Sequence, residues 1–138
     1  MVSYIVLARM QPAGKEVVVP IGNNIVFDTI VSDNGTAISY DANSGIITFG
    51  DEGFYYIDWY VATQTGLSDD GSNWAIQTSI SKMSFIGSSH TKIAVTSGFA
   101  IINAAVSETA KLVNVSNEAL ILSHSVKSKA ALSVYKVA

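Results

Sequence analysis

The sequence holds two histidines, His90 and His124, which lie among serines in the stretches GSSHT and LSHSV. A histidine beside serines invites comparison with hydrolases, in which histidine takes the proton of a serine nucleophile. The nucleophile elbow of such enzymes needs Gly-x-Ser-x-Gly between a strand and a helix, and the sequence contains no such pattern. We therefore expect both histidines in loops or at strand ends, and no catalytic residue. A triad built from distant residues is the alternative, which only geometry can test.

Acidic residues gather in two short runs, Asp51-Glu52-Gly53 and Asp69-Asp70-Gly71. Calcium takes about six to eight oxygen ligands, and neither run has the alternating acidic positions of an EF-hand loop. The chain has no cysteine, which excludes thiolate zinc sites, disulfides and cysteine nucleophiles. We expect both runs to be turns in solvent, with no metal site and no cofactor.

Asp58 differs from these acids because it lies inside an aromatic stretch, GFYYIDWYV, at Gly53–Val61. Side chains alternate between the two faces of a strand. One face of this stretch carries Tyr55, Ile57, Trp59 and Val61, and the other carries Phe54, Tyr56, Asp58 and Tyr60. A carboxylate on an apolar face needs a partner if it is buried. Asp58 is therefore paired with a lysine of a neighbouring strand or subunit, exposed like an ordinary aspartate, or a ligand of a cation on a symmetry axis.

Two further features have simple structural explanations. Trp59 is predicted to lie in the core, whereas Trp74, after the polar loop Gly66–Asn73, is either a core residue or a platform for stacking a ligand. Two sequons for N-glycosylation, Asn34-Gly35-Thr36 and Asn114-Val115-Ser116, are weak signals because such triplets arise often by chance.

The elements that would position these residues are almost all strands. Turn signals recur about every 8–12 residues between β-branched and aromatic runs, which is typical of a β-sandwich or jelly roll. The expected strands are Ser3–Ala8, Glu16–Gly22, Asn24–Ile30, Thr36–Asp41, Ile46–Gly50, Gly53–Thr65, Trp74–Phe85, Thr91–Val106, Thr109–Ser116, Ala119–Val126 and Lys129–Ala138. Turns are expected at Asp33–Gly35, Asn43–Gly45, Gly87–His90 and near Ser107-Glu108. The Ala-rich segment from Phe99 to Val113 fits a strand pair at least as well as a helix. The 138 residues are expected to form one domain, 1–138.

Composition indicates a chain that buries apolar surface against copies of itself. Only 14% of residues are charged, against roughly 25% in ordinary soluble domains. Hydrophobic residues make up 49%, yet no apolar run approaches the roughly 18 residues of a membrane span. The net charge is −3, with no basic stripe for a phosphate backbone. We expect no membrane insertion and no nucleic-acid partner.

The central sequence YDANSGIITFGDEGFYYIDWY resembles the signature of the C1q-like domain, within the tumour-necrosis-factor-like (TNF-like) jelly-roll superfamily. That signature places an aromatic residue, a Phe and a Gly-x-Tyr-x-Phe-x-aromatic motif at fixed spacing. The matching positions are Tyr40, Ile47, Gly53, Tyr55, Ile57 and Trp59. Ile47 and Ile57 replace Phe, and Phe27 and Asn34 lie a residue or two from their expected places. The resemblance implies an all-β, ten-stranded jelly roll that assembles as a homotrimer. It also implies that Phe54, Tyr56, Asp58 and Tyr60 face the other subunits.

The stretch NGTAISYDANSGIITFGDEGFY and the ending ALSVYKV are most similar to the C-terminal domains of bacterial collagen-like surface proteins, including BclA-type glycoproteins of the spore exosporium. This resemblance implies an extracellular or spore-surface domain, preceded by a collagen-like stalk in a longer protein, that trimerises and caps the stalk. It brings no catalytic residue and no cofactor. The alternatives are a trimeric adhesin head that binds a host surface protein, matrix protein or glycan through loops such as Gly66–Asn73, and the tip of a phage or other fibre.

Overall fold

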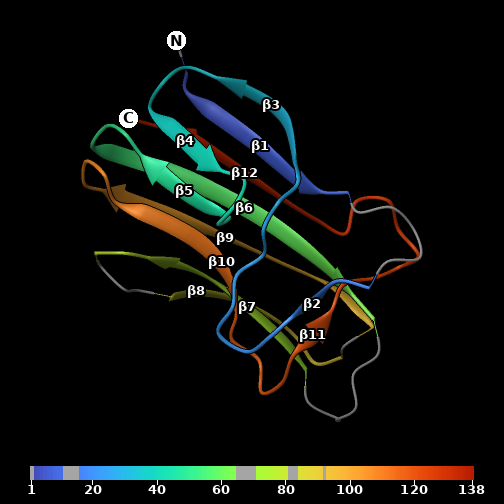
Figure 1. Cartoon of the computed structure of the whole chain (residues 1–138). Helices are drawn as coiled ribbons and strands as arrows, with labels where there is room; N and C mark the ends of the chain where they lie inside the picture. Colours follow the sequence, from blue (N-terminus) through green and yellow to red (C-terminus); the bar gives the residue numbers. More distant parts are fainter. Residues whose placement is uncertain (1, 11–15, 65–70, 81–83, 92) are drawn as a thin grey trace.

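The computed structural model describes residues 2–10, 16–64, 71–80, 84–91 and 93–138, and these residues form two packed β-sheets without a helix (Figure 1). The described strands are β1 (Tyr4–Arg9), β2 (Val18–Val19), β3 (Thr29–Asn34), β4 (Ile38–Asp41), β5 (Ile46–Phe49), β6 (Gly53–Thr63), β7 (Ser72–Thr78), β8 (Ser84–Ser89), β9 (Ala94–Ala104), β10 (Thr109–Asn114), β11 (Leu120–Ile121) and β12 (Ala130–Lys136). Since helices are absent from this part of the chain, it has no helix that could cross a membrane.

The strands form two five-stranded antiparallel sheets and one short ribbon. The order in the first sheet is β3-β1-β12-β6-β9, and we call it the aromatic sheet after its outer surface. The second has the order β4-β5-β10-β7-β8, and we call it the polar sheet. The ribbon pairs β2 with β11. The expected all-β sandwich of ten strands is confirmed, with this ribbon added.

The core lies between the two sheets and follows from alternation along the strands. In β6, Tyr55, Ile57, Trp59 and Val61 point inward and are at most 4% exposed. From the polar sheet, Trp74 and Ile76 of β7 and Leu112 of β10 meet them and are also buried. One contiguous apolar core therefore holds the sandwich together, without disulfides.

The prediction of a strand at Asn24–Ile30 is wrong for residues 24–28. This segment is irregular up to Asp28, and β3 begins only at Thr29. The Tyr40 hydroxyl accepts a hydrogen bond from the backbone N–H of Phe27 (2.7 Å) and donates one to the Phe27 carbonyl (2.8 Å). A side chain thus satisfies backbone groups that a neighbouring strand would otherwise bond. The apolar pattern here reflects burial of Ile25 and Phe27 rather than sheet pairing.

The turn expected at Gly87–His90 is also wrong, because residues 87–89 belong to β8. A Cβ on Gly87 would lie 2.7 Å from the Trp59 indole and closer still to the Ser97 carbonyl oxygen. Gly98, opposite Trp59 on β9, has the same indole 2.6 Å from its own Cβ position. These glycines are required by packing around Trp59, where β8 and β9 close one edge of the sandwich.

Two other expected strands are much shorter in the structure: Glu16–Gly22 contains only β2, and Ala119–Val126 contains only β11. The stretch Trp74–Phe85, expected as one strand, contains the end of β7 and the start of β8. The loop Gly66–Asn73 ends earlier than expected, since β7 begins at Ser72, and residues 65–70 lie outside the described part of the chain. The turn near Ser107 is confirmed, with Ser107 at a φ of 69°. The flanking strands β9 and β10 belong to different sheets and do not pair with each other.

Candidate functional site

The outer surface of the aromatic sheet carries a broad set of aromatic and aliphatic side chains. The pairing registers place Tyr4 beside Tyr135, Tyr135 beside Tyr56, and Tyr56 beside Ile101, so one row crosses β1, β12, β6 and β9. Within this row the Tyr56 and Tyr135 rings lie 5.2 Å apart, and Phe99 stacks on Tyr56 at 6.2 Å. We call this surface the aromatic face; its other members are Val6, Ala8, Phe54, Asp58, Tyr60, Ala62, Val95, Ser97, Phe99, Asn103, Ala131 and Ser133 on the same four strands.

Large apolar side chains on the aromatic face are open to solvent in the single chain. Phe99 is 63% exposed, Ile101 57% and Phe54 48%. Tyr56 and Tyr60 are half-buried by their neighbours in the sheet. Contiguous apolar surface of this kind, as opposed to scattered single residues, is characteristic of an interaction site.

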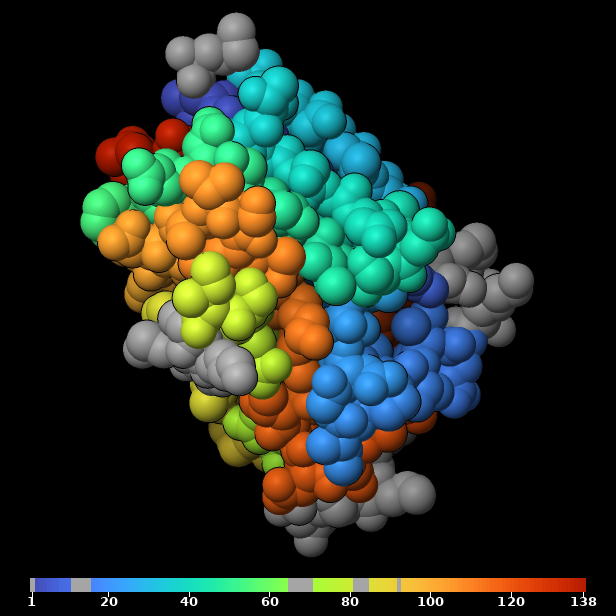
Figure 2. All heavy atoms as spheres, turned by 60° about the vertical axis from the view of Figure 1, so that its left-hand side comes forward, coloured from blue at the N-terminus to red at the C-terminus, as the bar shows by residue number. Residues whose placement is uncertain are grey.

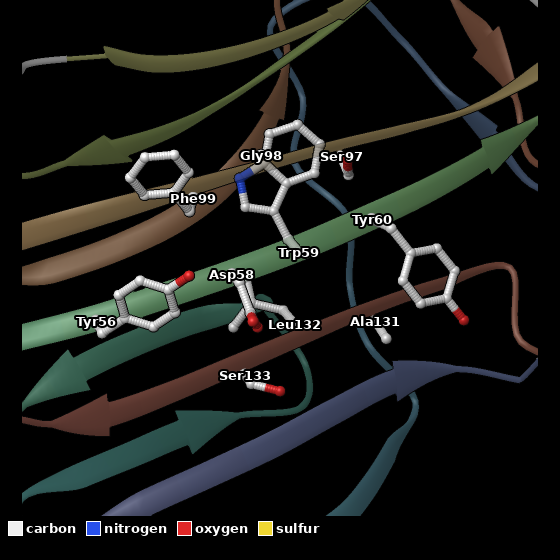
Figure 3. Close-up of a pocket in the computed structure, with 10 residues that line it drawn as sticks. All are labelled: Tyr56, Asp58, Trp59, Tyr60, Ser97, Gly98, Phe99, Ala131, Leu132 and Ser133. Carbon is white, nitrogen blue, oxygen red and sulfur yellow. The ribbon is translucent and has the colours of Figure 1, made fainter.

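A shallow hollow of about 460 Å³ lies in the middle of the aromatic face. Figure 3 shows Tyr56, Phe99 and Tyr60 around it, with Asp58 and Ser133 between them. Gly98 contributes backbone to the lining, between Ser97 and Phe99. The hollow is aromatic at its sides and polar at its centre.

Asp58 is the only charged residue among the face positions that the registers define in the described strands. Its side chain is exposed, and it has no hydrogen bond or ion pair within the described part of the chain. Opposite it lie Phe99 on β9 and Ser133 on β12. In the single chain Asp58 is therefore a solvated carboxylate surrounded by uncharged groups.

The signature positions lie mainly in the core. Ile47, Tyr55, Ile57 and Trp59 are buried. The Tyr55 hydroxyl donates to the Asp51 carbonyl (2.7 Å), and burial raises the pKa of the Tyr55 phenol. Tyr40 is half-buried, and burial raises the pKa of its phenol as well.

Gly53, at the start of β6, lies against the C-terminal residues of the chain. Its φ is 148°, and a Cβ there would clash with the Ala138 carbonyl oxygen. The last residues of the chain pair with Phe54 beside it: Phe54 N–H donates to the Ala138 carbonyl, and Val137 N–H donates to the Phe54 carbonyl. This close approach explains why the position carries glycine.

The other candidate residues do not come together as a chemical site. His90 is exposed after β8, and His124 lies in a bend, where its Nε2 is 3.5 Å from Gln64 Nε2. Within the described residues neither imidazole bonds a serine hydroxyl or a carboxylate, and no group of three potential metal-ligating side chains occurs. Asp51 is exposed near Lys136 (4.0 Å), whereas Asp69 and Asp70 lie outside the described residues.

The structure also decides the tryptophan and sequon questions. Trp74 is fully buried and its indole N–H donates to the Ser72 hydroxyl (2.9 Å), so it is a core residue and not a stacking platform. Asn114 is fully buried and donates to the Val19 and Glu118 carbonyls, so its amide is inaccessible to modification. Asn34 lies at the end of β3 and donates to the Val2 carbonyl.

Sequence reasoning missed the contribution of β9 to the aromatic face. Between Ala94 and Ile101, the inner residues of β9 are small (Ala94, Thr96, Gly98, Ala100), whereas three of the four outer residues are large (Val95, Phe99, Ile101), Ser97 being the exception. This inversion was readable in the sequence: small residues alternating with large ones indicate that the bulk points away from the core.

The two-sheet topology with its shared apolar core is a jelly-roll fold of the C1q/TNF type. Comparison with solved structures gives the same fold. The globular domain of zebrafish complement 1qA has a TM-score of 0.71 at 12% identity, over 99% of this chain and 98% of that chain. Murine APRIL has a TM-score of 0.71 at 12% identity, over 99% of this chain and 100% of that chain. The PRD1 vertex protein P5 has a TM-score of 0.62 at 16% identity, over 99% and 96%.

No protein-family model matches the chain, and no curated protein matches it. The likeness that these comparisons show is therefore one of fold.

Proposed function

We propose that this domain is a non-enzymatic assembly module that forms a homotrimer through the aromatic face. The observation that carries the proposal is the size and composition of that face: exposed Phe54, Phe99 and Ile101 continue into the half-buried ring cluster of Tyr56. Water contact with so much apolar area is unfavourable by about 25 cal/mol per Å². A second and third copy of the chain would remove that area from water.

The polar sheet supports the choice of the aromatic face as the buried one. Its outer surface is seen in Figure 2, where β4 and β5 (teal) lie beside β10 (orange). The registers place Ser39, Thr48 and Thr109 across this surface, with Gln77 and Lys111 beyond them. The polar sheet also exposes one isoleucine, Ile86 of β8, but it has no exposed aromatic cluster like that of the aromatic face in the described residues. The two faces of the sandwich would therefore have different roles.

The trimer would nucleate and cap a collagen-like stalk on a bacterial surface, in particular that of a spore. Both ends of the chain lie at the same end of the sandwich, as Figure 1 shows. A stalk that precedes β1 would thus leave each subunit at one end of the trimer. Collagen helices need three chains brought together, and a trimer supplies this by raising the local concentration of the chain ends.

The mass of the isolated domain tests this proposal. Sedimentation equilibrium at micromolar concentration, without added metal, should give three times the chain mass of 14.6 kDa. A monomer mass would refute it. The stalk is tested separately: the full open reading frame should contain a Gly-x-y tract upstream of this domain.

A second candidate function is a trimeric head that binds a host protein or glycan, or that forms the tip of a phage or other fibre. The resemblance to the PRD1 vertex protein P5 supports this candidate. A reading frame with a fibre or capsid-attachment segment in place of a Gly-x-y tract would favour it over the stalk.

A further inference from the structure

Burial of the aromatic face leaves one problem unsolved, which is the charge of Asp58. The carboxylate lies in the hollow with Tyr56 and Tyr60 as the titratable groups of its own strand, and with uncharged Phe99 and Ser133 opposite. Covering an ionised carboxylate without a counter-ion is costly. Among the described residues no cation lies on the face, so a counter-ion from these residues would have to come from beyond it.

The described cations differ in their availability. Four of them are occupied or remote: Arg9 lies 3.9 Å from Asp28, Lys136 lies 4.0 Å from Asp51, Lys129 is buried, and Lys111 is on the polar sheet. Lys127 is exposed and has no hydrogen bond or ion pair among the described residues. It belongs to a loop, residues 123–128, that leads directly into β12 of the aromatic sheet.

The 123–128 loop is tied to the border of the aromatic face. The Tyr60 hydroxyl, a member of the face, donates to the Ser128 hydroxyl (2.6 Å). Figure 3 shows the Tyr60 ring directed toward the start of β12, where this loop ends. Tyr60 lies two residues from Asp58 on the same side of β6, which is about 7 Å along a strand.

The same loop is held in one shape by a buried lysine. Lys129 is 1% exposed, and its Nζ donates to the Ser123 carbonyl (2.9 Å) and the Val126 carbonyl (3.0 Å). At the start of the loop, His124 N–H donates to the Gln64 side-chain carbonyl (3.0 Å). Burial of an ammonium group is unfavourable unless the group is hydrogen-bonded. The two hydrogen bonds from Lys129 therefore tie both ends of the loop together and restrict its conformation. A preorganised loop loses little entropy on binding.

We propose that Lys127 of one copy pairs with Asp58 of the next copy around the ring. The proposal rests on the proposed trimer. A closed ring of three uses head-to-tail contacts, in which different surfaces of the same chain meet at each junction. The loop borders the aromatic face at the end of β6, so it lies where a neighbour would cover that face. The pair neutralises the carboxylate and fixes the register of the subunits.

Charge reversal tests the pair directly. Asp58→Lys and Lys127→Glu each place like charges at every junction and should weaken self-association about tenfold or more at each contact. The double variant should recover assembly. Lys111→Glu, which makes the same charge change on the polar sheet, is the matched control and should assemble like wild type. Both target side chains are exposed, so far-UV circular dichroism should show all the variants folded.

Mixing the two single variants shows whether the pair joins different copies. A mixed ring contains junctions with opposite charges, but a ring of three must also contain one junction between like chains. The mixture should therefore recover less assembly than the double variant. A pair formed within one chain would give no recovery on mixing.

Two results would overturn the pair while leaving the trimer intact. One is wild-type assembly of both single variants. The other is tighter assembly of Asp58→Asn, which would show that the carboxylate has no counter-ion to lose. A wild-type chain that sediments as a monomer would instead refute the proposed trimer, and the pair with it.

Discussion

Substitutions of neighbouring residues of β6 should change different properties of the protein, because their side chains lie on opposite faces of one strand. Inward residues should affect subunit stability, and outward residues should affect assembly. Trp59 points into the core and is 4% exposed. Its indole lies against the backbone of Gly98 and reaches Gly87 on the other sheet, so it fills the seam between β9 and β8. Trp59→Ala empties this seam and should cost about 3–5 kcal/mol. Against a total stability of about 5–15 kcal/mol, that is a large loss.

The loss translates into a measurable shift of the unfolding midpoint. With an unfolding entropy of about 2 cal/mol/K per residue, a chain of this size shifts by about 3–4 °C for each kcal/mol. We expect Trp59→Ala to lower the midpoint by about 10–17 °C. The loss concerns the subunit itself, so it should appear whether or not the subunits are associated.

Tyr56→Glu should spare the subunit and damage assembly. Tyr56 contacts Phe99 and Tyr135 on the aromatic face, and removing two aromatic contacts at a half-exposed site costs about 1–3 kcal/mol. In the trimer the new carboxylate would be buried beside Asp58 at each of three junctions. Glutamate is preferable to lysine here, since a lysine two residues from Asp58 would supply a counter-ion.

Sedimentation and circular dichroism together separate the two outcomes. Tyr56→Glu should sediment as a monomer with a β-type spectrum, and Trp59→Ala should unfold at lower temperature. If Tyr56→Glu remains trimeric while Trp59→Ala dissociates without unfolding, the faces of β6 are reversed and the aromatic face is not the interface.

Three further predictions concern packing, pH and metals. Gly98→Ala and Gly87→Ala each bring a Cβ within 3 Å of the Trp59 indole. Each should lower the free energy of unfolding, measured by denaturant titration, by about 1–3 kcal/mol. Unchanged unfolding midpoints would show that the seam is loosely packed. Burial raises the pKa of the Tyr40 and Tyr55 phenols, so as pH rises these groups lose their protons in the unfolded chain before they do in the folded one. The free energy of unfolding should therefore be constant up to about pH 10 and decrease at higher pH. Tyr40→Phe should make this decrease smaller. EDTA should leave the unfolding midpoint unchanged, and a large fall restored by calcium would point to a metal site outside the described residues.

The sequence predicts strands best where alternation and burial agree. In Gly53–Val61 the inward residues are large and apolar, and the strand β6 begins at the expected residue. The same logic fails for Ile25 and Phe27, which are buried outside any strand. Ile25 makes one backbone hydrogen bond to Leu112, and the Tyr40 hydroxyl rather than a strand bonds the backbone of Phe27. Burial alone does not distinguish a strand from an irregular segment pressed against the core.

The misplaced turn at Gly87 has a different cause. Glycine in a sequence reads as a turn signal because of its backbone freedom. Here it is required by the size of Trp59, which is distant in the chain. Long-range packing of this kind is invisible to local patterns. The 123–128 loop was missed for the same reason, since nothing local marks Lys129 as buried or Ser128 as a partner of Tyr60.

The placement of the two tryptophans gives the domain built-in fluorescent reporters. Trp59 lines the hollow of the aromatic face, whereas Trp74 is fully buried on β7 of the opposite sheet. These are the only tryptophans in the chain. In a Trp74→Phe chain, all indole emission would come from Trp59, which lies beneath the aromatic face and is 4% exposed, so this emission would respond to a neighbouring copy and also to unfolding. Emission from a Trp59→Phe chain would follow the core of the subunit instead. A stopped-flow phase that appears in the chain that keeps Trp59 and not in the chain that keeps Trp74 would thus report association, without an attached dye.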